Sequence, residues 1–93
     1  MLRLAPSARF RRDMKRAQKR GKDMGKLKTL INMLAAEQPL PASCQAHPLK
    51  GPWKPHWDAH IEPDWLLIYL AEDGFLFLAR TGSHADLFAS TRK

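Results

Sequence analysis

The sequence predicts an α+β domain in which an N-terminal helical hairpin packs on a small antiparallel sheet with a mixed edge, in the order β-α-α-β-β-β. Two observations support this fold class. Apolar residues repeat at helical spacing over residues 10–35, whereas residues 56–80 hold three short apolar segments separated by turn-forming residues. A chain of 93 residues has room for one hydrophobic core, so we expect a single domain over residues 1–93.

The first 21 residues contain the expected first strand and first helix. The strand spans Leu2 to Ala5, because Pro6 ends it. Ser7 is a residue type that caps helices, and it precedes a predicted helix over residues 8–20 that Gly21 ends. The apolar stripe of this helix is narrow and consists of Phe10, Met14 and Ala17.

A second helix is predicted from a cap at Asp23 to Glu37, since Pro39 and Pro41 follow and cannot continue it. A short Gly-containing turn before it makes the two helices an antiparallel pair. Residues 40–55 are rich in proline and small residues, and we expect an irregular connection there. The apolar positions of the second helix are Leu27, Leu30, Ile31, Leu34 and Ala35.

Three strands are then predicted, over residues 56–62, 65–71 and 75–80, with an Asp-Gly hairpin turn at residues 72–74. Thr81 and Gly82 would end the last strand, and Ser83 would cap a final helical turn that carries His84, Leu87 and Phe88. We assign only a core role to the apolar strand residues Leu66, Leu67, Ile68, Leu76, Phe77 and Leu78.

Charge is divided unevenly between the two halves of the chain. Residues 1–40 contain eleven Lys and Arg against three acids, a net charge of +8, whereas residues 41–93 contain five against six, a net charge of −1. Solubility alone does not explain so dense a cationic half, which suits a polyanionic partner. We expect RNA contacts from five residues of the first helix: Arg11, Arg12, Lys15, Arg16 and Lys19.

The compartment follows from the single cysteine and from hydropathy. Cys44 is the only cysteine, so an intramolecular disulfide is excluded and a reducing compartment fits best. The N-terminal residues lack the apolar stretch of a signal peptide. The longest apolar run, Trp65 to Ala71, is far shorter than the ~20 residues that a spanning helix needs. We expect a cytoplasmic protein with no membrane segment.

The C-terminal half concentrates groups that suit metal-free RNA cleavage. This reaction needs a base for the 2′-hydroxyl, an acid for the leaving oxygen and cations for the phosphate. Histidine, with an ordinary pKa of ~6.5, serves as acid or base near neutral pH. The sequence therefore predicts a ribonuclease, and its candidate residues are His47, His60, Asp64, Arg80 and His84.

Two other chemistries fit the sequence less well. Zinc would draw on His56, His60, Asp64 and His84, but their spacing matches no standard zinc pattern and no cysteine pair is present. Cys44 lies in a Pro/Ala/Ser segment with no adjacent base, so it lacks the activation that a nucleophilic thiol needs. We expect neither a metal nor another cofactor.

Several separate segments occur in the order and at the spacing of one known family. They are Gln18-Lys19-Arg20-Gly21-Lys22-Asp23-Met24, His47-Pro48-Leu49, Trp53-Lys54, Asp58-Ala59-His60, Glu62-Pro63-Asp64-Trp65, Leu67-Ile68-Tyr69 and Arg80-Thr81-Gly82-Ser83-His84. With these segments and the expected element order, the chain resembles the YafQ family of bacterial toxins, within the RelE/ParE superfamily of type II toxin–antitoxin systems. The resemblance runs from about residue 10 to Phe88.

The resemblance implies a RelE-like fold and a ribosome-dependent mRNA endonuclease. It would cut mRNA in the A site of the 70S ribosome, by attack of a ribose 2′-hydroxyl on the adjacent phosphate, and so inhibit translation. The implied partner is a small antitoxin with an acidic C-terminal segment and an N-terminal segment that binds operator DNA. The alternatives are a non-catalytic, basic nucleic-acid-binding module and a superfamily toxin that poisons a protein target such as gyrase.

Carried over by position, the active-site residues of the family correspond to His47, His60, Asp64 and His84. We expect His84 to be the general acid, and Asp64 with nearby His60 to supply or orient the base. His47 and Arg80 would hold the phosphate, Arg80 through its two-pronged donors. Spacing alone leaves the division of roles among the three histidines open.

Two aromatic residues match supporting positions of the family. Trp65 and Phe88 would either stack on RNA bases or pack in the core, and core packing is the stronger expectation for Trp65, which opens an apolar strand. The chain also departs from the family, because Pro55-His56-Trp57 replaces a common Gly-x-Arg. We therefore expect no RNA contact from the usual arginine and none from His56.

Overall fold

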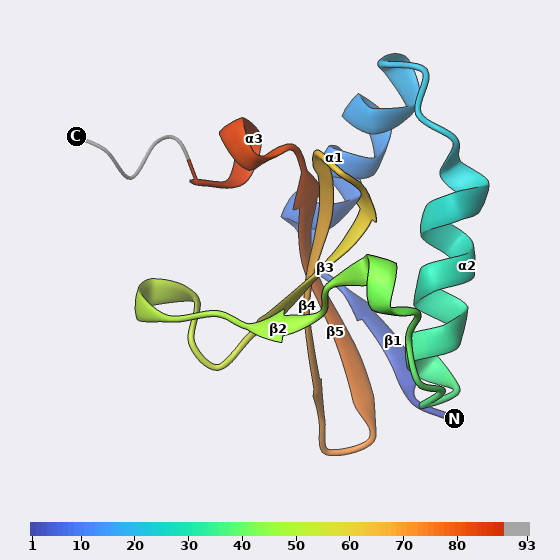
Figure 1. The fold of residues 1–93 in the computed structure, drawn as a ribbon, viewed down its shortest axis with the longest axis vertical. Helices are drawn as coiled ribbons and strands as arrows, with labels where there is room; N and C mark the ends of the chain where they lie inside the picture. Colours follow the sequence, from blue (N-terminus) through green and yellow to red (C-terminus); the bar gives the residue numbers. More distant parts are fainter. Residues whose placement is uncertain (89–93) are drawn as a thin grey trace.

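A five-stranded mixed sheet in the order β1-β5-β4-β3-β2 forms the centre of the molecule (Figure 1). The computed structural model describes residues 1–88. Only β1 runs parallel to its neighbour, β5, and the other pairs are antiparallel, so the predicted α+β class and mixed edge are confirmed. The elements are β1 (Arg3–Pro6), α1 (Ala8–Lys19), α2 (Met24–Ala35), η1 (Ala42–Cys44), β2 (His47–Pro48), η2 (Gly51–Trp53), β3 (Trp57–Glu62), β4 (Trp65–Glu72), β5 (Phe75–Gly82) and α3 (His84–Phe88).

Local chemistry starts the helices where it was predicted to. The Ser7 hydroxyl accepts from the Phe10 N–H at 2.9 Å, and the Asp23 carboxylate accepts from the Gly25 N–H at 3.0 Å. The expected stripe of α1 was wrong at one position. Met14 is 36% exposed, whereas Asp13 is 4% exposed and faces the sheet. An apolar stripe does not identify this face, because a buried carboxylate occupies its centre.

The sheet separates two hydrophobic clusters. On the α1 and α2 side, strand residues of odd number on β4 pack against the helices, and Leu67 shares this cluster with Phe10 and Leu27. On the other side, Leu66 and Ile68 pack with Leu87 of α3. Figure 1 shows α2 on one side of the sheet, and α3 and the η2 loop on the other.

Two expectations for the strands need correction. Phe77 is 37% exposed, because Leu76 and Leu78 point to the helices and alternation turns Phe77 to the uncovered face. Thr81 and Gly82 continue β5 rather than end it, since they pair with β4 residues Leu67 and Leu66.

The connection over residues 40–55 is not wholly irregular. It contains η1, η2 and the short strand β2, which pairs His47 with Asp58 of β3. Pro6 also belongs to β1, where an edge position tolerates a residue without an N–H. The hairpin turn is as predicted, with positive φ at Asp73 (54°) and Gly74 (81°). No helix among residues 1–88 has the length and apolar character that crossing a membrane requires.

Candidate active site

The three predicted histidines meet on the sheet face that α1 and α2 leave uncovered. Alternation along β3 places Asp58 and His60 on this face, and the β2 register brings His47 opposite Asp58. Helix α3 then carries His84 over the same face, beside Asp64 of the β3–β4 turn. The site is therefore assembled from two strands, one turn and a helix.

Asp64 and His84 form the shortest polar contact of the site. The imidazole Nδ1 lies 2.6 Å from Asp64 Oδ1, and the same oxygen accepts the His84 backbone N–H at 2.9 Å. These bonds hold the pKa of the Asp64 carboxyl below its ordinary range, the backbone bond contributing most. An ionised carboxylate accepts a hydrogen bond from Nδ1–H. The other ring nitrogen of the half-exposed imidazole, Nε2, is then the atom that can exchange a proton with a substrate.

His60 lies next to His84. The two ring centroids are 5.7 Å apart at an angle of 44°, and His60 Nδ1 is 3.4 Å from the Cys44 carbonyl oxygen. His60 and Cys44 line a hollow of about 360 Å³ that is open to one side. Burial raises the pKa of the Cys44 thiol, which keeps it in the unreactive thiol form.

Asp58 is a site residue that sequence reasoning did not assign. Asp58 is buried, with 4% of the residue exposed, and its Oδ1 lies 3.0 Å from His47 Nδ1. His47 Nδ1 donates its hydrogen bond to the Gln45 carbonyl oxygen, at 2.9 Å, rather than to Asp58. Asp58 Oδ1 is thus a buried oxygen without a hydrogen-bond partner among the described residues.

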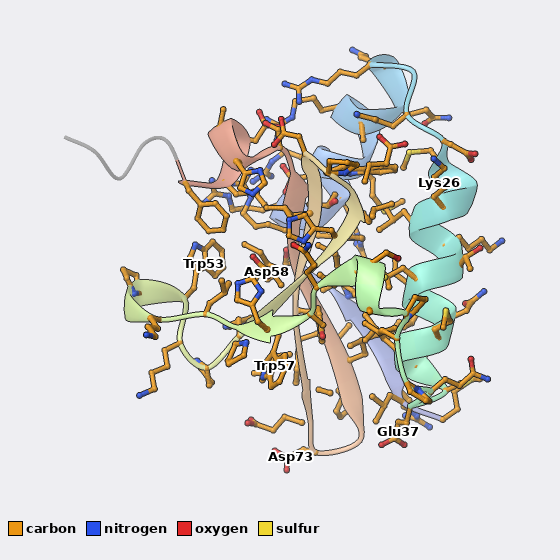
Figure 2. The ribbon with its side chains drawn as sticks, in the orientation of Figure 1. Lys26, Glu37, Trp53, Trp57, Asp58 and Asp73 are labelled. Atoms are coloured by element: carbon orange, nitrogen blue, oxygen red, sulfur yellow. The ribbon has the colours of Figure 1, made fainter. Side chains whose placement is uncertain are left out.

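The carboxyl of Asp58 lies in an environment that contains all three histidines. Burial raises the pKa of its carboxyl, and nearby His47, His60 and His84 lower that pKa in decreasing order. Figure 2 shows Asp58 on the side of the sheet away from α2. The segment Asp58-Ala59-His60 was part of the family pattern, and strand alternation could have placed Asp58 on the same face as His60.

Arg80 is not placed to hold a phosphate, and this expectation was wrong. Its Nε and Nη2 donate to the two carboxylate oxygens of Asp13 at 3.0 and 2.8 Å, so this edge of the guanidinium is occupied. Only 9% of Arg80 is exposed, and Asp13 also accepts the Thr81 N–H at 3.2 Å. A buried carboxylate needs such partners, and Arg80 therefore ties α1 to β5.

The two aromatic candidates separate. Trp65 is 1% exposed and packs with the helix-side cluster, with Lys22 Nζ 5.7 Å from its ring centroid, so it offers no face to an RNA base and the stacking role is wrong. Phe88 is half-buried beside His84, with centroids 6.4 Å apart. Phe88 thus remains the aromatic candidate for base stacking.

The basic face of α1 also divides. Arg11, Arg12, Lys15 and Lys19 are exposed and have no ion-pair partner within residues 1–88. Arg16 differs, because its Nη2 donates to Asp13 Oδ1 at 3.0 Å and lies 3.7 Å from Asp86 Oδ2. The RNA contact expected of Arg16 is thus in competition with a contact inside the molecule.

His56 contacts Trp53 of the η2 loop. Its Nδ1 is 3.0 Å from the Trp53 carbonyl oxygen, and its ring meets the Trp53 ring edge-on with centroids 5.7 Å apart. Trp57, which was expected to stand in place of an arginine, is 41% exposed. In the described part of the chain, no group of three His, Cys, Asp or Glu side chains converges to hold a metal ion.

Known proteins are similar to this chain in sequence and in fold. The family model described as a bacterial toxin of type II toxin–antitoxin systems, YafQ, matches residues 2–89. The mRNA interferase toxin YafQ of Escherichia coli K12 is 53% identical over 83 residues, which are 88% of this chain and 90% of that protein. The crystal structure of YafQ from E. coli BL21(DE3) matches with a TM-score of 0.90 at 48% identity, over 95% of this chain and 99% of the other.

A further similar structure is that of a protein complex. The toxin chain in the E. coli DinJ–YafQ crystal structure matches with a TM-score of 0.88 at 49% identity, over 95% of this chain and 99% of that chain. The family match, the sequence identity and the fold all agree over nearly the whole chain. The chain belongs to the YafQ family of bacterial toxins of type II toxin–antitoxin systems.

Proposed function

We propose that this protein is an endoribonuclease toxin that cuts mRNA in the ribosomal A site, through attack of a ribose 2′-hydroxyl on the adjacent phosphate. The observation that carries the proposal is the set of three imidazoles around Asp58 and Asp64 on one uncovered face. Imidazoles in this number supply an acid, a base and positive charge without a metal. Similarity to an mRNA interferase toxin supports the choice of RNA as substrate.

His84 is the general acid of this proposal. Asp64 accepts the Nδ1 proton and the backbone N–H of the same residue, so the ring is held in one orientation. Nε2 is then the atom that protonates the leaving 5′-oxygen.

The general base is His47 or His60 rather than Asp64. A carboxyl whose pKa lies below its ordinary range is a weak proton acceptor, and Asp64 is already bound to His84. His47 is oriented by the Gln45 carbonyl and faces Asp58, while His60 lies against His84. One of these two imidazoles removes the 2′-hydroxyl proton, and the other holds the phosphate.

The ribosome and an antitoxin are the proposed partners. Exposed cations of α1 suit ribosomal RNA, whereas the site itself offers few groups that position mRNA. Alignment by the ribosome would supply that positioning, since an error of ~1 Å can cost about 10²-fold in rate. The E. coli relative forms a complex with DinJ, and we propose a comparable small antitoxin here, with an acidic segment for this basic chain and a DNA-binding segment for its operator.

The test is mRNA cleavage on programmed ribosomes by the wild type and by the His84→Ala variant. We expect the variant to lose about 10²- to 10⁴-fold in rate, the usual contribution of a general acid or base, and to keep its fold and antitoxin binding. Free mRNA is the control for dependence on the ribosome. A folded, ribosome-bound wild type that makes no cuts would overturn the proposal in favour of a binding module.

A further inference from the structure

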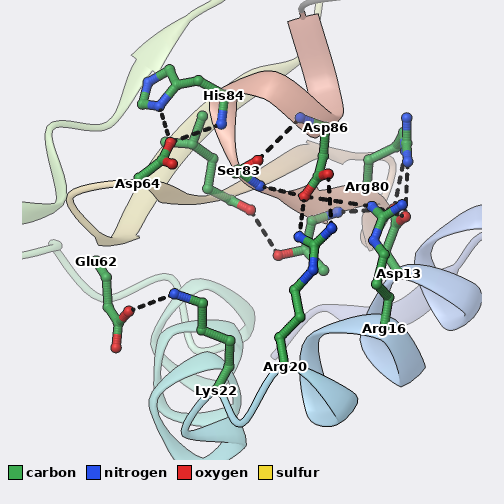
Figure 3. A network of polar contacts seen from close by, with 12 residues as sticks. Asp13, Arg16, Arg20, Lys22, Glu62, Asp64, Arg80, Ser83, His84 and Asp86 are labelled. Atoms are coloured by element: carbon green, nitrogen blue, oxygen red, sulfur yellow. Dashed lines mark hydrogen bonds and ion pairs between the residues drawn. The ribbon is translucent and has the colours of Figure 1, made fainter.

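Helix α3 has five residues and carries His84. A helix this short is not stable by itself, so its position depends on contacts with the rest of the molecule. Three kinds of contact anchor it to the rest of the molecule. Leu87 packs against Leu66 and Ile68, His84 binds Asp64, and Asp86 faces α1 (Figure 3). The first contact is apolar and the second belongs to the site. The third links the site to a distant element, and its role is unassigned.

Asp86 is first part of a capping box. Its Oδ2 accepts the Ser83 N–H at 2.9 Å, and its own N–H donates to Ser83 Oγ at 3.1 Å. This reciprocal pair satisfies two backbone N–H groups at the start of α3 and confirms Ser83 as the predicted cap. The capping box sets where α3 begins but does not tie it to another element.

Two arginines of the α1 region bind the same carboxylate. Arg20 donates from Nη1 to Oδ2 at 2.7 Å and from Nη2 to Oδ1 at 3.2 Å, and Arg16 Nη2 lies 3.7 Å from Oδ2. Arg16 also binds Asp13, which binds Arg80. Figure 3 shows this continuous chain of ion pairs from β5 through α1 to α3. The Asp86 side chain is 13% exposed, and the bond from Arg20 is the main reason that its pKa lies far below the ordinary range.

Gly82 gives independent support for a close approach at this point. A Cβ atom at position 82 would lie 2.9 Å from both Cβ and Oδ2 of Asp86. Real Cβ atoms do not approach a neighbouring Cβ so closely, so a larger residue would displace Asp86 and with it α3. The strand end is therefore shaped to receive this carboxylate.

We propose that Asp86, held by Arg16 and Arg20, is a positioning residue that places His84 for catalysis. The proposal rests on the ribonuclease function above. Its cause is geometric: α3 without this anchor keeps its cap and Leu87 but can shift relative to β4, and a shift of ~1 Å at a reacting group can cost about 10²-fold in rate. Arg16 and Arg20 act here inside the protein, not on RNA.

The sharpest variant is Asp86→Asn, because the amide oxygen still accepts the Ser83 N–H while the negative charge is removed. We expect kcat on programmed ribosomes to fall about 10-fold or more with KM unchanged. Gly82→Ala should likewise lower kcat and leave KM unchanged, although it changes no charge. The matched control is Glu62→Gln, which removes the partner of Lys22 and Lys26 but touches nothing in α3, and its kcat should equal the wild-type value.

A double-mutant cycle separates positioning from RNA binding. Arg20→Ala should lower kcat as Asp86→Asn does, and the double variant should be no worse than either single one, because both remove the same ion pair. If Arg20 instead contacts RNA, Arg20→Ala raises KM and the two effects add. That result would overturn the proposal.

A structural readout keeps the inference testable even if the protein cuts no mRNA. The ring contact between His60 and His84, with centroids 5.7 Å apart, should give proton–proton nuclear Overhauser effects in the wild type and in Glu62→Gln. We expect these signals to weaken or vanish in Asp86→Asn and Gly82→Ala. Unchanged signals in both variants would contradict the positioning role, whereas absent cleavage by the wild type would contradict only the ribonuclease function.

Discussion

Two groups of carboxylates in this molecule differ in their cationic partners. Asp13 and Asp86 bind the guanidinium groups of three arginines. Asp58 and Asp64 lie against imidazoles. Arginine is charged at every pH the protein meets and its fork fills both carboxylate oxygens, so these pairs hold the scaffold together. Histidine gains and loses its proton near neutral pH, so the second group can do chemistry.

Exposure reinforces the difference between the two groups. Asp13 is 4% exposed and both of its carboxylate oxygens accept hydrogen bonds, whereas the side chains of His84 and Asp64 are 54% and 67% exposed. Asp58 is the exception on the imidazole side, since it is buried and its Oδ1 lacks a hydrogen-bond partner among the described residues. A buried charge that the fold leaves incompletely satisfied is typical of a functional site.

The largest effect is expected from removing Asp13, the carboxylate that binds both Arg16 and Arg80. Asp13→Ala leaves Arg80 buried without its partner and removes the acceptor of the Thr81 N–H. The free energy of unfolding should fall by about 3–5 kcal/mol, the usual result of removing one member of a buried pair. Urea denaturation measures it. A fall in activity with unchanged stability would mean that Asp13 belongs to the site rather than to the scaffold.

Asp58→Asn should give the opposite result. The rate of mRNA cleavage should fall about 10-fold or more, a part of the roughly 10²- to 10⁴-fold that acid–base catalysis supplies. The free energy of unfolding at pH 7 should rise instead of fall. Burial raises the pKa of the folded-state carboxyl above its unfolded value, so the folded protein binds more protons between the two values and the wild type loses stability as pH rises through that window.

Denaturation at pH 4 and pH 7 checks this sign. The difference between wild type and Asp58→Asn should grow toward pH 7 and shrink toward pH 4. A variant that is less stable than the wild type at pH 7 would show that Asp58 belongs with Asp13, and the contrast between the two groups would fail.

The smallest effects on the protein itself are expected on the outer face of α1. Lys15→Ala or Lys19→Ala should change the free energy of unfolding by no more than about 0.5 kcal/mol, because neither exposed residue has an ion-pair partner in the described chain. Each should make the dependence of ribosome binding on salt less steep, by about 0.7–0.9 in the log–log slope for each phosphate that the variant no longer neutralises. Arg16→Ala is the comparison. We expect it to lower the free energy of unfolding more than Lys15→Ala or Lys19→Ala does, and to change the salt slope less. Equal slopes for all three variants would contradict the division of α1 into an outer and an inner face.

The helices and turns of this protein were predictable because each depends on residues close in the chain. Ser7, Asp23 and Ser83 cap helices through N–H groups two or three residues away, and Asp73-Gly74 forms its turn by itself. Apolar repeats placed the core strands in the same way, except where alternation turned Phe77 outward. The short strand β2 escaped prediction, because its two residues pair with a strand beyond the η2 loop and carry no pattern of their own.

The residues of the candidate site were likewise predicted only in part. The resemblance named the histidines, and the structure brings His47, His60 and His84 together around Asp58, a residue the sequence did not single out. Arg80 and Trp65 were matched to supporting positions, yet one binds Asp13 and the other lies in the core. Nothing near residue 80 in the sequence points to an aspartate 67 positions earlier.

By itself, the sequence determined the fold class, the caps and turns, the basic first helix and the membership of the toxin family, since these follow from short-range hydrogen bonding, apolar spacing and local motifs. Only the tertiary structure decided which cations serve the scaffold and which face solvent. That choice depends on burial and on sheet register, because a guanidinium beside a buried carboxylate binds it, while the same group on an open helix face remains in solvent.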